Sequence, residues 1–282
     1  MEKWVKSIII SRITFISVCV ISFGCNDKSS TSTTIESNQK VTLASVTTEK
    51  SIPTIKSDDH VLVFIDKSSS IGAKNEIKFT GDQEKKLIEI LKTNGGKLTI
   101  YFIHKNLASA SHHFEQNFAK PDINGMVEMK AKTNLNKFNK SLDSIEVFIN
   151  EAISKKAGTG NSNETDMWIT VKKINDKFSQ KPSSAKLHVV YLSDMIEAVV
   201  SYNCGKNYSG IKINTVDMAR KLAETDYPMF KKCYNITSLP KNLSIMMYFP
   251  TDANPNKDYR NYPEYWKALF AKFGVESVES NI

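Results

Sequence analysis

The sequence predicts an α/β fold in which a mostly parallel central sheet is flanked by helices. Apolar runs typical of buried strands alternate along the chain with amphipathic helical patterns, which is the order of a parallel sheet covered on both faces. The first of these runs, Val61–Ile65, has five consecutive apolar residues, as expected for a strand buried on both sides. Acidic side chains lie at the ends of two of the runs: Asp66 follows the first run directly, and Asp194 follows Leu187–Leu192 after one serine.

The elements are justified in order by their patterns. After the first strand, apolar residues at helical spacing predict an amphipathic helix over Gln83–Thr93, and Gly95 and Gly96 end it. Leu98–Ile103 is a second apolar strand, and a third lies within residues 108–118. Residues 120–140 are polar without a clear period, so an insertion or long loop is expected there.

The second half of the domain repeats the alternation. Its expected elements, each carried by apolar periodicity, are helices over Ser144–Lys156 and from Thr165 to Phe178, a strand at Leu187–Leu192, a helix at Thr215–Thr225, a strand at Leu243–Phe249, a last helix from Pro263 to Phe273 and a short edge strand at Val275–Val278.

The start of the chain predicts export. Basic residues precede an apolar run, Ile13–Phe23, that suits a signal peptide better than a membrane span. Gly24-Cys25 follows, an arrangement that resembles a bacterial lipoprotein signal in which Cys25 carries the lipid. An uncleaved anchor and a plain secretory signal are the alternatives. All of them place the domain outside the cytoplasm, in the cell envelope, and Asn26 favours the outer membrane over the inner one.

Three parts are therefore expected: a signal peptide over residues 1–24, a disordered Ser/Thr-rich tether over 25–57, and one domain over 58–282. The net charge is +8, and the leader supplies +2 of it. The lysines are scattered, with a modest cluster that we interpret as a solvated face at Lys130, Lys132, Lys137 and Lys140. Without aromatic–basic motifs, nucleic acid is not an expected partner.

The polar residues after the strands form a candidate cation site. Asp66, Ser68 and Ser70 make an Asp-x-Ser-x-Ser loop whose carboxylate and hydroxyls suit a small hard cation such as Mg²⁺. Ligands of parallel sheets bind at the carboxyl ends of strands. Thr165, before a helix, and Asp194, after a strand, would join this loop if the two strands are neighbours. Thr159 competes with Thr165 for the threonine position.

These residues resemble the metal-ion-dependent adhesion site of a von Willebrand factor type A (VWA) domain, and the resemblance covers nearly all of residues 58–280. It implies a doubly wound, Rossmann-like fold and Mg²⁺ as the ion, with Mn²⁺ or Ca²⁺ as alternatives. Direct ligation by Ser68, Ser70 and Thr165 is implied, with Asp66 and Asp194 acting through water. An acidic side chain of a protein partner would complete the coordination. Met195 departs from the family pattern, which often has glycine there.

The predicted function is therefore a lipid-anchored module for adhesion or protein binding, not an enzyme. The alternatives are a metal-dependent hydrolase that uses the same oxygens and a degenerate domain with a structural role. The sequence lacks a Gly-x-Ser-x-Gly elbow and the HExxH spacing, which disfavours catalysis. In an oxidising compartment, Cys204 and Cys233 are candidates for a disulfide.

Overall fold

The computed structural model describes residue 54 and residues 57–66, 81–103, 113–154, 165–197, 211–249 and 261–281. All of them belong to one compact unit, Lys50–Ile282. The elements along it are β1 (His60–Asp66), α2 (Gly81–Asn94), β2 (Gly96–Ile103), β3 (His113–Phe118), α3 (Glu128–Ser154), α4 (Trp168–Phe178), β4 (Leu187–Leu192), α5 (Val216–Tyr234), β5 (Leu243–Tyr248), α6 (Tyr262–Lys272) and β6 (Ser277–Asn281).

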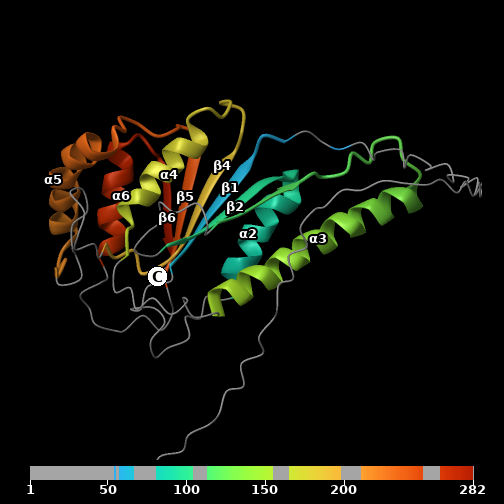
Figure 1. Cartoon of the computed structure of the whole chain (residues 1–282), viewed down its shortest axis with the longest axis horizontal. Helices are drawn as coiled ribbons and strands as arrows, with labels where there is room; N and C mark the ends of the chain where they lie inside the picture. The colour runs from blue at the N-terminus through green and yellow to red at the C-terminus, as the bar shows by residue number, and fades with distance from the viewer. Residues whose placement is uncertain are drawn as a thin grey trace, which may run out of the picture. The chain divides into compact units, whose positions relative to one another are not determined.

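The strands form one mixed sheet of six, in the order β3-β2-β1-β4-β5-β6 (Figure 1). Every neighbouring pair is parallel except β2 and β3, which are antiparallel. The predicted α/β class with a mostly parallel central sheet is confirmed. The strand β1 lies between β2 and β4, with Ile65 opposite Leu192, so the ends of β1 and β4 are adjacent.

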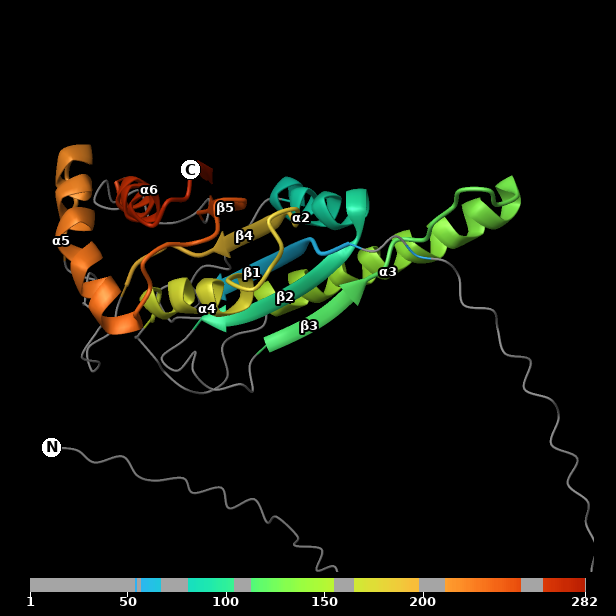
Figure 2. The ribbon, with the colours of Figure 1, turned by 90° about the horizontal axis from the view of Figure 1, so that it is seen from above.

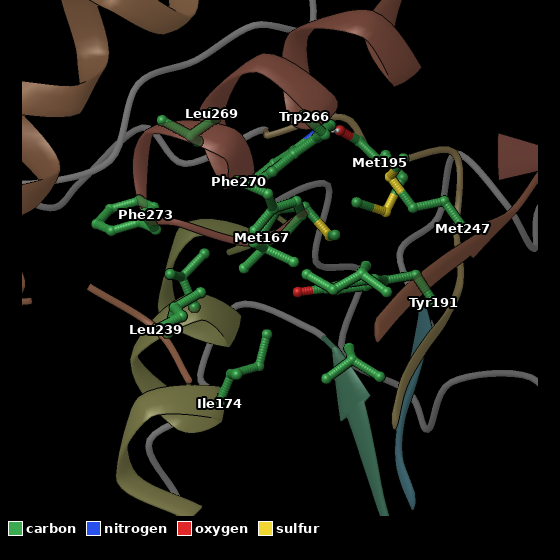
Figure 3. Packing of buried hydrophobic residues seen from close by; sticks show 14 of the residues in the cluster. Met167, Ile174, Tyr191, Met195, Leu239, Met247, Trp266, Leu269, Phe270 and Phe273 are labelled. Carbon is green, nitrogen blue, oxygen red and sulfur yellow. Dashed lines mark hydrogen bonds between the residues drawn. The ribbon is translucent and has the colours of Figure 1, made fainter. Parts of the chain in front are cut away.

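Helices cover both faces of this sheet because its central strand is apolar on both sides. Val61, Val63 and Ile65 of β1 face a core cluster to which α2 and α3 contribute. Leu62 and Phe64 face a second, larger cluster built with α4, α5 and α6, part of which Figure 3 shows. The five-residue apolar run therefore serves two cores, as expected for a central parallel strand.

The turn between α2 and β2 depends on its two glycines. Gly95 has φ +71° and Gly96 has φ +120°, values that L side chains rarely adopt. A side chain at either position would also collide with a backbone carbonyl oxygen, that of Phe118 or that of Asp59. This explains why the helix ends where the sequence predicts.

One prediction of the element order is wrong. Residues 120–140 do not form a long loop, because α3 begins at Glu128 and continues for 27 residues to Ser154. The buried side of α3 is formed by apolar residues that face the sheet: Phe138, Leu142, Ile145 and Ile149. The first turns of α3 extend beyond the edge of the sheet in both views (Figures 1 and 2) and are largely exposed, so they lack the apolar period that marks a helix.

Smaller differences concern the ends of elements. The helix α5 continues to Tyr234, nine residues past the predicted end, and closes at Asn235 in the left-handed conformation (φ 53°). The edge strand β6 is present but begins at Ser277 rather than Val275. Among the described residues, no helix is both long and apolar enough to cross a bilayer.

Candidate functional site

Asp66 occupies the carboxyl end of the central strand. It is the last residue of β1 and only 1% exposed. Its carboxylate accepts a hydrogen bond of 2.7 Å from the hydroxyl of Ser193, which directly follows β4. Because β1 and β4 are parallel neighbours, the residues after the two strands meet at one edge of the sheet.

Ser193 is a residue that the sequence reasoning missed. Its buried hydroxyl donates to Asp66 and accepts the backbone N–H of Met195 at 2.9 Å. The same oxygen lies 3.7 Å from the sulfur of Met167, which precedes α4. One hydroxyl thus touches all three segments of the predicted site. Its position immediately after a buried apolar strand was the available signal.

Asp194 and Met195 form a tight turn above β4. The Asp194 carboxylate accepts the amide of Ile196 at 3.1 Å, which holds the turn locally. Met195 is fully buried and has φ 61°, a left-handed conformation that is uncommon for a residue other than glycine. Its carbonyl accepts the indole N–H of Trp266 at 2.7 Å, and Figure 3 shows this ring against Met195.

The backbone conformation of Met195 is one that favours glycine over a residue with a side chain. A glycine adopts this conformation without steric cost, whereas a side chain there costs of order 1 kcal/mol. Here the methionine side chain packs into the larger core cluster. The turn therefore keeps a conformation suited to glycine, and buried apolar contacts offset the strain.

Thr165 is 2% exposed and lies three residues before the first residue of α4. The neighbouring Asp166 carboxylate accepts the amide of Ile169 at 3.0 Å, so Asp166 caps the helix. Burial raises the pKa of Asp166, and the bond from Ile169 opposes that rise. Asp166 therefore supplies a capping hydrogen bond at the start of α4, next to the predicted ligand Thr165.

Glu197 completes the capping and was also missed. One of its carboxyl oxygens accepts the amides of Met167, at 2.6 Å, and Trp168, at 2.9 Å. The other oxygen is buried and has no hydrogen-bond partner among the residues that the structure describes. Burial raises the pKa of Glu197 well above its ordinary value, and the nearby charge of Asp166 acts in the same direction. Glu197 thereby fastens the loop after β4 to the start of α4.

The described part of the predicted ligand set is Asp66, Thr165 and Asp194. These are oxygen donors only, a chemistry that fits a hard divalent cation rather than zinc or copper. The described residues contain no group of three or more His, Cys, Asp or Glu side chains that could hold a metal ion. Several predicted residues lie outside the described ranges and stay predictions: Ser68, Ser70, Thr159, Cys25 and Cys204. Cys233, near the end of α5, is disulfide-bonded.

Comparisons with known proteins give no family. No protein-family model matches the chain, and no curated protein is significantly similar to it. Among solved structures, the pilus adhesin SpaC of Lactobacillus rhamnosus GG in its open conformation is similar at 9% identity and a TM-score of 0.39, over 82% of this chain and 28% of that one.

Two further structures are similar at the same level. The mussel byssus proximal thread matrix protein 1 has 10% identity and a TM-score of 0.29, over 79% of this chain and 50% of its own. The human COPII-coat protein Sec24c has 12% identity and a TM-score of 0.33, over 83% and 30%. The chain spans at most about half the length of these proteins. Likenesses this weak support no argument about function.

Proposed function

We propose that this chain is a lipid-anchored, extracytoplasmic binding module of the VWA type that engages a protein partner through a bound Mg²⁺. The observation that carries the proposal is the hydrogen bond of 2.7 Å between Ser193 and Asp66. It joins the ends of β1 and β4 at the edge where parallel sheets bind ligands. The same edge receives the segment before α4 through the contact of Ser193 with Met167.

The strand order supports a doubly wound, VWA-type arrangement. The chain winds from β1 outward to β2 and β3, then returns to β4 and continues outward to β5 and β6. The switch between the two directions falls between β1 and β4, which is where ligands of such sheets bind. Asp66 is the last residue of β1 and Asp194 lies two residues past the end of β4, so the acidic residues of the proposed site lie at the switch.

Each residue has a proposed role at this edge. Ser68, Ser70 and Thr165 would hold the ion directly, while Asp66 and Asp194 would act through bound water. Bound Mg²⁺ would offer an exchangeable position to an acidic side chain of the partner. Mn²⁺ or Ca²⁺ are the alternative ions. Ser193 would keep the Asp66 carboxylate in one orientation, because its hydroxyl is itself fixed by the Met195 amide.

Calorimetry of the full chain in detergent with Mg²⁺ tests the proposal. Asp66→Asn keeps an oxygen for the Ser193 hydroxyl but removes the charge, and we expect roughly a tenfold or greater loss of Mg²⁺ affinity. The matched control is Asp176→Asn, an acid on α4 that is 44% exposed and pairs with Lys172. The Asp176→Asn variant should bind Mg²⁺ with the same affinity as the wild type.

Two results would contradict the proposal: no heat with the wild-type chain, or equal heat with the Asp66→Asn variant. Thermal unfolding of both variants in the absence of the ion separates loss of fold from loss of binding. Release of phosphate from an aryl phosphate that requires Mg²⁺ and Asp66 would instead favour the hydrolase alternative.

A further inference from the structure

The projecting start of α3 carries an apolar surface that the proposed function does not use. We define the α3 tip as residues 121–133, from Pro121 to the first turns of α3. Ile123 is 38% exposed, Val127 77% and Met129 81%. These are three of the six large apolar residues that are exposed in the described part of the chain, and they lie within seven residues of each other.

The tip is a folded turn. The Asp122 carboxylate accepts the amide of Asn124 at 3.1 Å, and the Ile123 carbonyl accepts the amide of Met126 at 3.1 Å. The Val127 carbonyl then accepts the amides of Lys130 and Ala131, which starts the helix. Backbone bonds of this kind fix the direction of the apolar side chains, so little ordering is needed when the tip binds a surface.

The surroundings of the tip are basic. Lys130, Lys132, Lys137 and Lys140 of α3 are all exposed, while Asp122 and Glu128 are the acids of the same stretch. Apolar side chains at the end of a projection, with lysines behind them, match the interface of an anionic bilayer. The apolar groups would enter the headgroup region and the lysines would face lipid phosphates.

The chain also enters the domain beside the tip. Thr54 forms an antiparallel bridge with Pro121, the first residue of the tip. Residues 26–53 connect this point to the proposed lipid site at Cys25. A lipid anchor on the chain before Thr54 would raise the concentration of lipid near the tip.

We propose that the α3 tip docks on an anionic lipid surface and inserts Ile123, Val127 and Met129 among the headgroups. Docking does not depend on the cation site, and the proposed anchor would only raise the local concentration of lipid. Docking would orient the domain relative to the membrane that carries it.

Amide hydrogen exchange of the full chain tests the proposal. The chain is reconstituted in vesicles of phosphatidylcholine alone and of phosphatidylcholine with one quarter phosphatidylglycerol. Exchange at residues 121–131 should be roughly tenfold slower in the anionic vesicles. The double variant Val127→Ser/Met129→Ser should lose this protection. Val147→Ser, which alters a side chain 57% exposed on the same helix, is the matched control and should keep it.

The outcomes separate the explanations. Equal exchange in both lipids, or protection that persists in the Val127→Ser/Met129→Ser variant, would overturn the proposal. Protection that grows with protein concentration without lipid would assign the tip to a second copy of the chain and would also overturn it. If the chain does not float with the vesicles in a density gradient, the proposed anchor is contradicted. In that case, adding the same vesicles to the free chain still tests whether the tip binds lipid.

Discussion

Although Glu197 lies in a loop, removing its side chain is expected to destabilise the fold strongly. In the Glu197→Ala variant, the amides of Met167 and Trp168 lose their acceptor. A buried donor without a partner costs about 1–3 kcal/mol. Part of this loss is offset because the variant also removes a buried carboxyl oxygen that has no partner in the described part of the chain. The net cost should be about 2–3 kcal/mol in the free energy of unfolding.

The isosteric Glu197→Gln variant isolates the charge. Its carbonyl oxygen can still accept both amides, so the cost should stay under about 1 kcal/mol. Burial raises the pKa of Glu197 above its value in the unfolded chain, so the folded state binds the proton more tightly. Its contribution is therefore fully present below the unfolded pKa and is lost as the pH rises through the folded pKa. Glutamine has no proton to lose, and its variant should lack this part of the pH dependence.

Urea unfolding of the wild type and both variants, at mildly acidic and mildly alkaline pH, measures these differences. A Glu197→Ala variant whose free energy of unfolding lies within about 0.5 kcal/mol of the wild type would refute the capping role of Glu197, since surface substitutions have effects of that size. A Glu197→Gln variant as unstable as Glu197→Ala would refute it too. A wild type that becomes more stable relative to Glu197→Gln as the pH rises would reverse the assigned sign of the pKa change.

Two further predictions concern residues near the same sheet. Met195→Gly and Met195→Ala both lose a buried side chain, but only glycine adopts the φ of 61° without strain. In thermal unfolding the glycine variant should therefore be more stable than the alanine variant by about 1 kcal/mol. The opposite order would exclude backbone strain at Met195. Burial, with Lys181 and Lys97 nearby, lowers the pKa of His60 to about 3. The stability that neutral His60 contributes is fully present above the unfolded pKa and should fall by up to about 5 kcal/mol as the pH drops through the folded pKa. His60→Gln should flatten this dependence in acid unfolding.

The sheet was predictable because its signal is local. Five apolar residues in a row identify β1, and the largely apolar run of β4 places Asp194 two residues beyond its end. The adjacency of β1 and β4 is a matter of topology, and the sequence could state it only as a condition. The first half of α3 was missed because it extends past the sheet, where no core requires an apolar period.

The supporting residues of the site lay beyond sequence reasoning for another reason. Ser193 and Glu197 have roles only through partners far along the chain: Asp66 is 127 residues from Ser193, and Met167 is 30 residues from Glu197. A serine and a glutamate in a loop have many ordinary roles, and only the folded geometry selects one. Predicted ligands can be found by motif, whereas the residues that hold them in place cannot.

The loop after β4 is the common element of these observations. Within five residues it donates to Asp66 through Ser193, accepts the Trp266 indole at Met195, and caps α4 through Glu197. Each bond ties the loop to a different element: β1, α6 and the start of α4. A turn that is strained at Met195 and buried at its ends is stable only if such bonds outweigh its cost. These bonds therefore fix the segment that carries Asp194, which is the preorganisation that the proposed oxygen site for a hard cation would need.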